Sequence, residues 1–264
     1  MYKFLTILIF LSTCAPAPPP KAAAGETGQA QATDTLLDVQ ADFSLDYLMG
    51  KFDPATHPDF TEIAVGYASR PGMYLRRDAY EAFLKLHAAA LQAGIRLQII
   101  SAARNFTAQK GIWEAKWTGS RLIENGKNAA QAYPDPVQRA LKILEYSSMP
   151  GASRHHWGTD IDLNNLSPQF FESGQGKKIH DWLAAHAAEY GFCQPYSPKG
   201  VSRPYGYNEE AWHWSHMPVS GKLMALAEQT LENENITGFA GAETAKEIDV
   251  VGKYVLGIHP DCLK

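Results

Sequence analysis

Apolar residues recur at helical spacing in several segments of the chain. In the segment 78–93, Ala79, Phe83 and Leu86 fall on one face, and Gly94 ends the run. A helix with this periodicity can bury one face against a core. The pattern predicts helices over 78–93, 106–117, 136–146, 177–190 and 220–231.

Strict alternation marks a strand just after the first of these helices. Ile95, Leu97 and Ile99 alternate with the polar residues Arg96 and Gln98, which predicts a strand over 95–100 with one buried face. Shorter apolar stretches predict further strands over 158–163, 212–216 and 250–256. Helices interleaved with short strands and without an internal repeat indicate an α+β fold, and periodicity leaves the strand order open.

The N-terminus has the pattern of an export signal. Lys3 precedes the apolar run 4–11, which is too short to span a bilayer as a helix. The sequence Leu-Ser-Thr-Cys at 11–14 then resembles the bacterial lipobox, in which the signal peptide is cut before a cysteine that carries lipid. We therefore expect a signal peptide over 1–13 and an exported protein, lipid-anchored through Cys14 to a bacterial cell membrane on its periplasmic or outer-surface side. A plain secretory signal with a chance cysteine is the alternative.

The next segment has the composition of a linker. Residues 14–40 contain a proline cluster followed by Ala, Gly, Thr and Gln, with few large apolar side chains, so they cannot build a core. We expect a folded domain over 41–225 that carries the functional site, and a C-terminal extension over 226–264 that packs on it.

Two cysteines remain besides Cys14. An exported chain reaches an oxidising compartment, where Cys193 and Cys262 can form a disulfide that ties the C-terminal tail to the domain. Two buried free thiols are the alternative.

Composition excludes one class of partner. The chain has 264 residues, 45% of them hydrophobic, and a net charge of −4. Because no basic stripe is present, we expect no nucleic-acid partner, and we expect a monomer.

The richest chemistry lies in a short segment with two imidazoles and two carboxylates. His155 and His156 are followed by Asp160 and Asp162 within ten residues, and such donors suit zinc, which takes about three protein ligands plus water at a catalytic site. Gly158 permits a turn that brings a histidine back towards the following strand. On that strand the two aspartates share a face.

A second segment supplies a further imidazole beside a carboxylate. Glu210 precedes His213 by three residues, so a bend must lie between them if both are to face one site. A glutamate beside the metal-bound water is the usual general base of a zinc hydrolase. On spacing alone, both a metal site and ordinary buried histidines remain open.

The order of these motifs resembles the VanY-type D-alanyl-D-alanine carboxypeptidases of the LAS metallopeptidase superfamily. Ser-x-His-x-x-Gly-x-x-x-Asp and Glu-x-Trp-His carry the resemblance, together with a strand that ends in Ser-x-x-Arg with Gln five residues beyond. The matching residues are Ser101, Arg104, Gln109, Ser153, His155, Gly158, Asp162, Glu210, Trp212 and His213. The resemblance implies a small antiparallel sheet flanked by helices, with zinc in a groove on the sheet.

The resemblance also implies roles for these residues. His155, Asp162 and His213 would bind zinc, Glu210 would be the general base and then the acid, and Arg104 would polarise the scissile carbonyl or hold substrate charge. The terminal carboxylate of the peptide would lie against Gln109 and Ser153. Asp160 departs from the family pattern, where alanine is common, and three roles are open to it. It could support the ligands from outside, pair with Arg154 or rival Asp162.

The implied activity is removal of the terminal D-alanine from peptidoglycan stem peptides. Three alternatives remain open: a cross-link endopeptidase, an L,D-carboxypeptidase of the same fold, and a non-catalytic wall-binding lipoprotein that keeps zinc for structure. The presence of Glu210 and Arg104 speaks against the last, because a purely structural metal needs neither.

Overall fold

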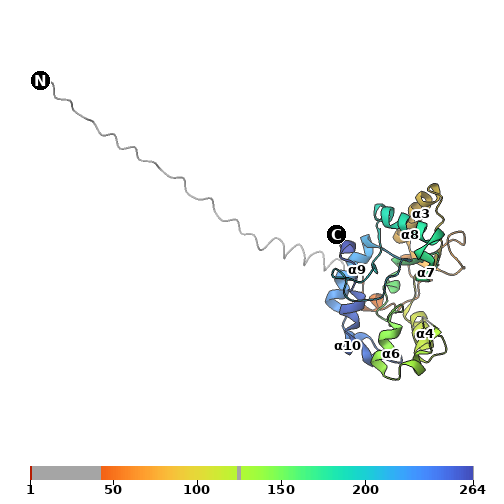
Figure 1. Cartoon of the computed structure of the whole chain (residues 1–264), viewed down its shortest axis with the longest axis vertical. Coiled ribbons are helices and arrows are strands. Elements are labelled where there is room, and N and C mark those ends of the chain that lie inside the picture. Colours follow the sequence, from red (N-terminus) through yellow and green to blue (C-terminus); the bar gives the residue numbers. More distant parts are fainter. Residues whose placement is uncertain (2–42, 124–125, 264) are drawn as a thin grey trace. The chain divides into compact units, whose positions relative to one another are not determined.

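The computed structural model describes residues 1, 43–123 and 126–263 (Figure 1). The expected signal peptide, Cys14 and the linker therefore lie outside the described residues, apart from Met1. All helices and strands reported below belong to the compact unit Asp38–Lys264. Within the described part of the chain, no helix is both long and apolar enough to cross a membrane.

A four-stranded antiparallel sheet forms the centre of this unit. Its strands are β3 (Ile99–Ser101), β4 (Asp160–Leu163), β5 (Phe192–Cys193) and β6 (His213–His216), in the order β3-β4-β6-β5. A separate antiparallel hairpin consists of β1 (Phe60–Glu62) and β2 (Tyr74–Arg76). The sheet is thus small and antiparallel, as the family resemblance implies.

Helices flank the sheet. In Figure 1, α3 and α8 lie at one end of the unit and α4 and α6 at the other. The helices are α2 (Leu45–Leu48), α3 (Arg77–Gln92), α4 (Phe106–Trp117), α5 (Ala129–Ala132), α6 (Pro136–Ile143), α7 (Pro168–Glu172), α8 (Gly174–His186), α9 (Met217–Thr230) and α10 (Ala245–Ile248). All five helices predicted from periodicity are present, with ends shifted by up to four residues, and the last turn of the predicted 177–190 helix is a separate 3-10 turn, Ala187–Tyr190.

The buried apolar residues form two clusters. One contains the inward residues of the sheet, Ile99, Ile161 and Leu163, packed with Phe83 of α3 and Leu183 of α8. The strand alternation therefore directs the isoleucine and leucine of β4 into a core and leaves its two aspartates on the other face.

The C-terminal extension belongs to the second apolar cluster. Ile236, Val250 and Ile258 are buried together with Trp113 of α4 and Leu144. Cys193 and Cys262 form a disulfide with their Cα atoms 5.5 Å apart. The tail is thus tied to β5, the edge strand next to β6.

The strand predicted over 250–256 is wrong. Residues Val251–Val255 form a single π-helical turn that follows α10. Val250 and Val251 are buried, as are Tyr254 and Val255, and this i, i+4 repeat belongs to a helix. The β-branched residues suggested a strand, but packing against the second cluster decided the conformation.

Candidate metal centre and substrate pocket

Strand register brings the two predicted motifs side by side. Asp162 of β4 lies opposite His213 of β6, and Asp160 lies opposite Ser215. Directly opposed residues in an antiparallel pair have their side chains about 5 Å apart. The second carboxylate of β4 and the imidazole of β6 therefore meet although they are far apart in the sequence.

His155 reaches the same place through a tight turn. It lies in the 3-10 helix Arg154–Trp157, which ends at Gly158 with a φ of 70°. A Cβ at Gly158 would lie 2.3 Å from the ring of Phe60, and a left-handed φ already favours glycine. Gly158 therefore allows the turn that directs His155 back over β4.

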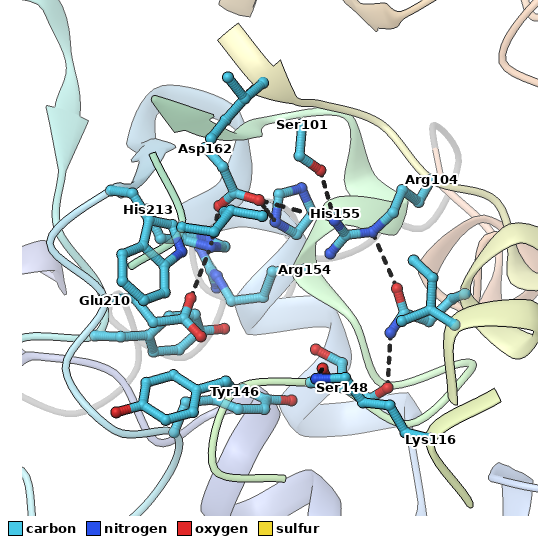
Figure 2. A pocket seen from close by; sticks show the side chains of 18 of the residues that line it. Ser101, Arg104, Lys116, Tyr146, Ser148, Arg154, His155, Asp162, Glu210 and His213 are labelled. Carbon is cyan, nitrogen blue, oxygen red and sulfur yellow. Dashed lines mark hydrogen bonds and ion pairs between the residues drawn. The ribbon is translucent and has the colours of Figure 1, made fainter. Parts of the chain in front are cut away.

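Three possible metal ligands converge at this point. Donor atoms of His155, Asp162 and His213 all lie within 4.8 Å of one another, and all three residues are buried (Figure 2). His155 Nε2 is 3.4 Å from Asp162 Oδ2, and His213 Nδ1 is 3.2 Å from Asp162 Oδ1. Two imidazoles and one carboxylate form a donor set that suits zinc with one position left for water.

The outer nitrogens of both imidazoles are held by groups that only accept hydrogen bonds. His155 Nδ1 lies 2.9 Å from the Ala102 carbonyl oxygen, and His213 Nε2 lies 2.8 Å from Asp160 Oδ2. Each of these nitrogens must therefore carry the proton, so the neutral imidazoles that bind a metal present their lone pairs at His155 Nε2 and at His213 Nδ1. Those lone pairs face carboxylate oxygens, and a cation between them removes the repulsion, so these residues fit a metal ion.

Asp160 is the fixed support of His213. Its carboxylate also accepts hydrogen bonds from Arg154 Nε at 3.1 Å, Ser215 Oγ at 2.7 Å and Thr159 Oγ1 at 2.8 Å. Burial raises the pKa of Asp160, but Arg154 and His213 outweigh it and hold that pKa well below its usual range. Of the three roles open to Asp160, the structure shows the pairing with Arg154 and the support of His213 from outside.

Glu210 stands beside the three ligands. Its Oε2 lies 3.3 Å from His213 Nδ1 (Figure 2), and the expected bend is the turn in which His213 N donates to the Glu210 carbonyl oxygen at 3.1 Å. Burial raises the pKa of Glu210, although the hydrogen bond with His213 opposes this. A raised pKa brings a carboxylate closer to the range in which it exchanges protons near neutral pH.

The same carboxylates act on His213. Burial lowers the pKa of its imidazole, but the carboxylates of Asp160, Asp162 and Glu210, which accept hydrogen bonds from the protonated ring, raise that pKa well above its usual value. The site thus has an excess of negative charge that attracts either a proton or a metal ion.

Arg104 also lies close to Asp162 and is held in place by its neighbours. Its Nε donates to Gln109 Oε1 at 3.0 Å, and the Gln109 amide donates to the Ser148 carbonyl oxygen at 2.7 Å. Arg104 Nη1 also donates to Ser101 Oγ and lies 3.8 Å from Asp162 Oδ2. The predicted motif Ser-x-x-Arg with Gln is therefore one connected unit, in which Gln109 orients Arg104.

The site opens into a cavity of about 410 Å³. Its lining includes Arg104, Gln109, His155, Asp162, Glu210, Trp212 and His213, but not Ser153. Ser153 Oγ is buried without a hydrogen-bond partner. The structure thus brings together every predicted site residue of the metallopeptidase motifs except Ser153, which does not line the cavity.

The neighbouring histidines are not in a position to bind the metal. His156 uses both ring nitrogens, since Nε2 accepts from Gly151 N at 3.0 Å and Nδ1 lies 2.6 Å from the Arg104 carbonyl oxygen. Burial lowers the pKa of His156 to about 3. His156 and His216 are also not among the residues that line the cavity.

Three tyrosines in the pocket were not predicted from the sequence. Tyr146, Tyr196 and Tyr207 line the cavity, and the Tyr196 ring lies 4.7 Å from the His213 ring. The only available signal was the density of tyrosine shortly before Glu210, which a packing role would explain equally well.

The fold and this donor set are those of a metal-dependent hydrolase site. The family described as VanY, D-alanyl-D-alanine carboxypeptidase, matches residues 72–219. This is more than half of the chain, which therefore belongs to the VanY D-alanyl-D-alanine carboxypeptidase family.

Sequence identity to an individual relative is low. The chain is 27% identical over 168 residues to YodJ of Bacillus subtilis, a provisionally named carboxypeptidase, and the match covers 60% of this chain and 52% of YodJ. The chain thus spans about half the length of that relative.

Solved structures with a similar fold include two peptidases. The LdcB LD-carboxypeptidase is 20% identical with a TM-score of 0.46, covering 78% of this chain and 81% of that one. A mutant of the vancomycin resistance D,D-pentapeptidase VanY in complex with Zn(II) is also 20% identical, with a TM-score of 0.44, covering 67% of this chain and 93% of that one.

Proposed function

We propose that the protein is a zinc-dependent carboxypeptidase that removes the terminal D-alanine from peptidoglycan stem peptides. The observation that carries the proposal is the convergence of His155 Nε2, Asp162 and His213 Nδ1 with Glu210 directly beside them. Membership of the VanY family supports the same substrate class.

His155, Asp162 and His213 would hold the ion. Bound zinc would supply Lewis acidity, which lowers the pKa of water to about 7 and polarises a carbonyl. The hydrogen bonds to Ala102 and Asp160 fix both imidazoles, so the ligands need little rearrangement.

Glu210 would move the proton in both halves of the reaction. As a carboxylate it accepts a proton from the attacking water, and it then donates that proton to the nitrogen of the leaving D-alanine. Its burial and its place next to His213 suit this exchange. No covalent intermediate on a serine or cysteine is required.

Arg104 would stabilise the negative charge that develops on the scissile carbonyl oxygen. Its guanidinium lines the cavity close to Asp162 and is oriented by Gln109. A donor held in place before the reaction costs no reorganisation during it.

The test is release of free alanine from defined muropeptides. The purified protein, loaded with zinc, is incubated with a pentapeptide that ends in D-Ala-D-Ala, with a tetrapeptide, and with a cross-linked dimer. We expect one alanine from the pentapeptide and an unchanged dimer. Release from the tetrapeptide alone would assign L,D-specificity, cleavage of the dimer would assign an endopeptidase, and no cleavage would leave only wall binding.

We also propose that the protein is exported and lipid-anchored through Cys14, because the apolar run 4–11 leads to the lipobox-like residues 11–14. C14S should move the protein from the membrane fraction to the soluble fraction, as measured by immunoblotting of fractionated cells. Unchanged membrane association would refute this anchor.

A further inference from the structure

Tyr207 is a pocket residue whose side chain is unusually constrained. It lines the cavity three residues before Glu210 and is only 2% exposed. Its ring packs edge-on against two other tyrosines, with centroids 4.8 Å from Tyr196 and 5.1 Å from Tyr254. Such pairs favour one ring orientation, so the phenol has little freedom to rotate.

The backbone of Tyr207 is held as firmly as its ring. The guanidinium of Arg203 donates from Nη1 to the carbonyl oxygens of Tyr205 and Tyr207, both at 2.9 Å. Arg203 is itself buried, at 1% exposure. Ring packing and the hydrogen bonds of the backbone therefore both fix the position of the Tyr207 hydroxyl.

Among the described residues, no hydrogen bond of normal geometry reaches that hydroxyl, although it is buried. The Ser148 side chain is the neighbour that interacts with the phenol, and this interaction lowers the pKa of Tyr207. Tyr47, another buried tyrosine, shows what the fold does elsewhere, because its hydroxyl donates to the Trp157 carbonyl oxygen at 3.0 Å and accepts from Arg76 at 2.9 Å. A buried polar group left without a partner destabilises the folded state.

The missing partner can come from the ligand. Burial raises the pKa of Tyr207, and this outweighs the interactions with Ser148 and Arg104, which lower it. The phenol is therefore protonated at any working pH and can donate. Within the cavity, the acceptors that a peptide brings are its carbonyl and carboxylate oxygens.

We propose that Tyr207 is a further catalytic residue, whose Oη donates a hydrogen bond to an oxygen of the bound peptide. This inference rests on the proposed carboxypeptidase function. It makes Tyr207 and Arg104 two donors that line one cavity with Glu210. The Tyr207 hydroxyl is unpaired in the free protein, and it gains a hydrogen-bond acceptor when the substrate binds.

The test is Y207F, which removes the hydroxyl and keeps the ring. We expect kcat/KM on the pentapeptide to fall by about 10- to 100-fold, as for loss of one hydrogen bond in a dry site. The melting temperature should stay the same or rise, because an unpartnered buried hydroxyl has been removed, and zinc content should not change. Activity and stability would thus move in different directions, which a packing role cannot produce.

Y254F is the matched control. Tyr254 packs edge-on against the same ring but lines a different cavity, so its variant should keep wild-type kcat/KM. The proposal is overturned if Y207F retains activity within twofold, if its melting temperature falls along with its activity, or if Y254F loses as much activity as Y207F.

A failure of the proposed function can be told apart from a failure of this inference. If the wild type releases no alanine, the proposed function is wrong. The role of Tyr207 is then tested by binding: calorimetry measures the affinity of the wild type and of Y207F for the peptide ending in D-Ala-D-Ala. Y207F should weaken binding by about tenfold, and equal affinity would overturn the role of Tyr207.

Discussion

At the scale of single residues, the site separates metal binding from proton transfer. His155, Asp162 and His213 supply the converging donor atoms, while Glu210 stands next to them with a raised pKa. The sequence motifs predicted all four residues and their proximity. They could not predict which ring nitrogens face the metal, because that depends on Ala102 and Asp160, which lie on other segments.

E210Q should therefore abolish most activity without removing zinc. Glutamine keeps the size and polarity of glutamate but cannot accept a proton from water. We expect zinc content and melting temperature close to the wild type, with kcat reduced by about two to four orders of magnitude. Metal analysis and turnover of the pentapeptide check both expectations.

D162N provides the contrast. It weakens one ligand, so zinc content and activity should fall together. If E210Q loses its zinc while D162N keeps both zinc and activity, the ligand and the base have been assigned the wrong way round.

Asp160 gives a second prediction at this scale. D160N leaves Arg154, whose side chain is fully buried, without its carboxylate, and it weakens the support of His213. We expect a 10- to 100-fold loss of zinc affinity, as for other outer partners of ligating histidines, together with a lower melting temperature. A variant with wild-type affinity and stability would contradict this role.

At the scale of elements, the long periodic segments were predictable and the short irregular ones were not. α3 follows its apolar stripe closely, because burial of one helical face fixes it. α4 has the predicted bounds, although its buried residues are Gln109, Trp113 and Lys116. The turn at 251–255 was mistaken for a strand because valine is favoured in strands, while its burial pattern depends on packing partners far away in the sequence. Strand order likewise depends on tertiary contacts that periodicity does not contain.

Tyr47 of α2 connects such elements and makes the fold sensitive to alkali. Its hydroxyl bonds Trp157 in the turn that carries His155. Burial raises the pKa of Tyr47 to about 12, from 10.0. Because the folded state keeps this proton longer than the unfolded state, the stabilisation is complete below pH 10 and is lost as the pH rises towards 12.

Urea unfolding of wild type and Y47F measures this effect. Between pH 9 and pH 11 the stability advantage of the wild type over Y47F should shrink by about 1 kcal/mol, since one pKa unit corresponds to about 1.4 kcal/mol. Other groups that titrate in this range cancel in the difference. An advantage that is constant with pH would contradict the assignment.

At the scale of the whole molecule, the C-terminal extension is part of the catalytic unit. Its apolar residues share a core with α4, and Cys262 is bonded to Cys193 of β5. The sequence predicted the pairing from the number of cysteines and the expected compartment. It did not show that the bond lies next to β6, the strand that carries His213.

Removal of this bond should destabilise the protein strongly. The two cysteines are 69 residues apart, and the chain-entropy model gives about 4 kcal/mol for a loop of this size. C193S/C262S should therefore have a much lower urea midpoint than the oxidised wild type. Wild type treated with reductant should approach the same midpoint, and equal midpoints before and after reduction would contradict the prediction.

The order of the strands also decides when the site can form during synthesis. β4 pairs with β3 and with β6, and each partner lies about 50 residues or more away along the chain, so the sheet closes late and folding is slow. A chain leaving the ribosome has no complete set of ligands until His213 has emerged. If the proposed export takes place before folding, the three ligands come together outside the cytoplasm. The affinity of such a donor set is higher for copper than for zinc, so affinity alone would not select zinc. The ion that the protein acquires would then depend on which metal is available in the compartment where folding ends.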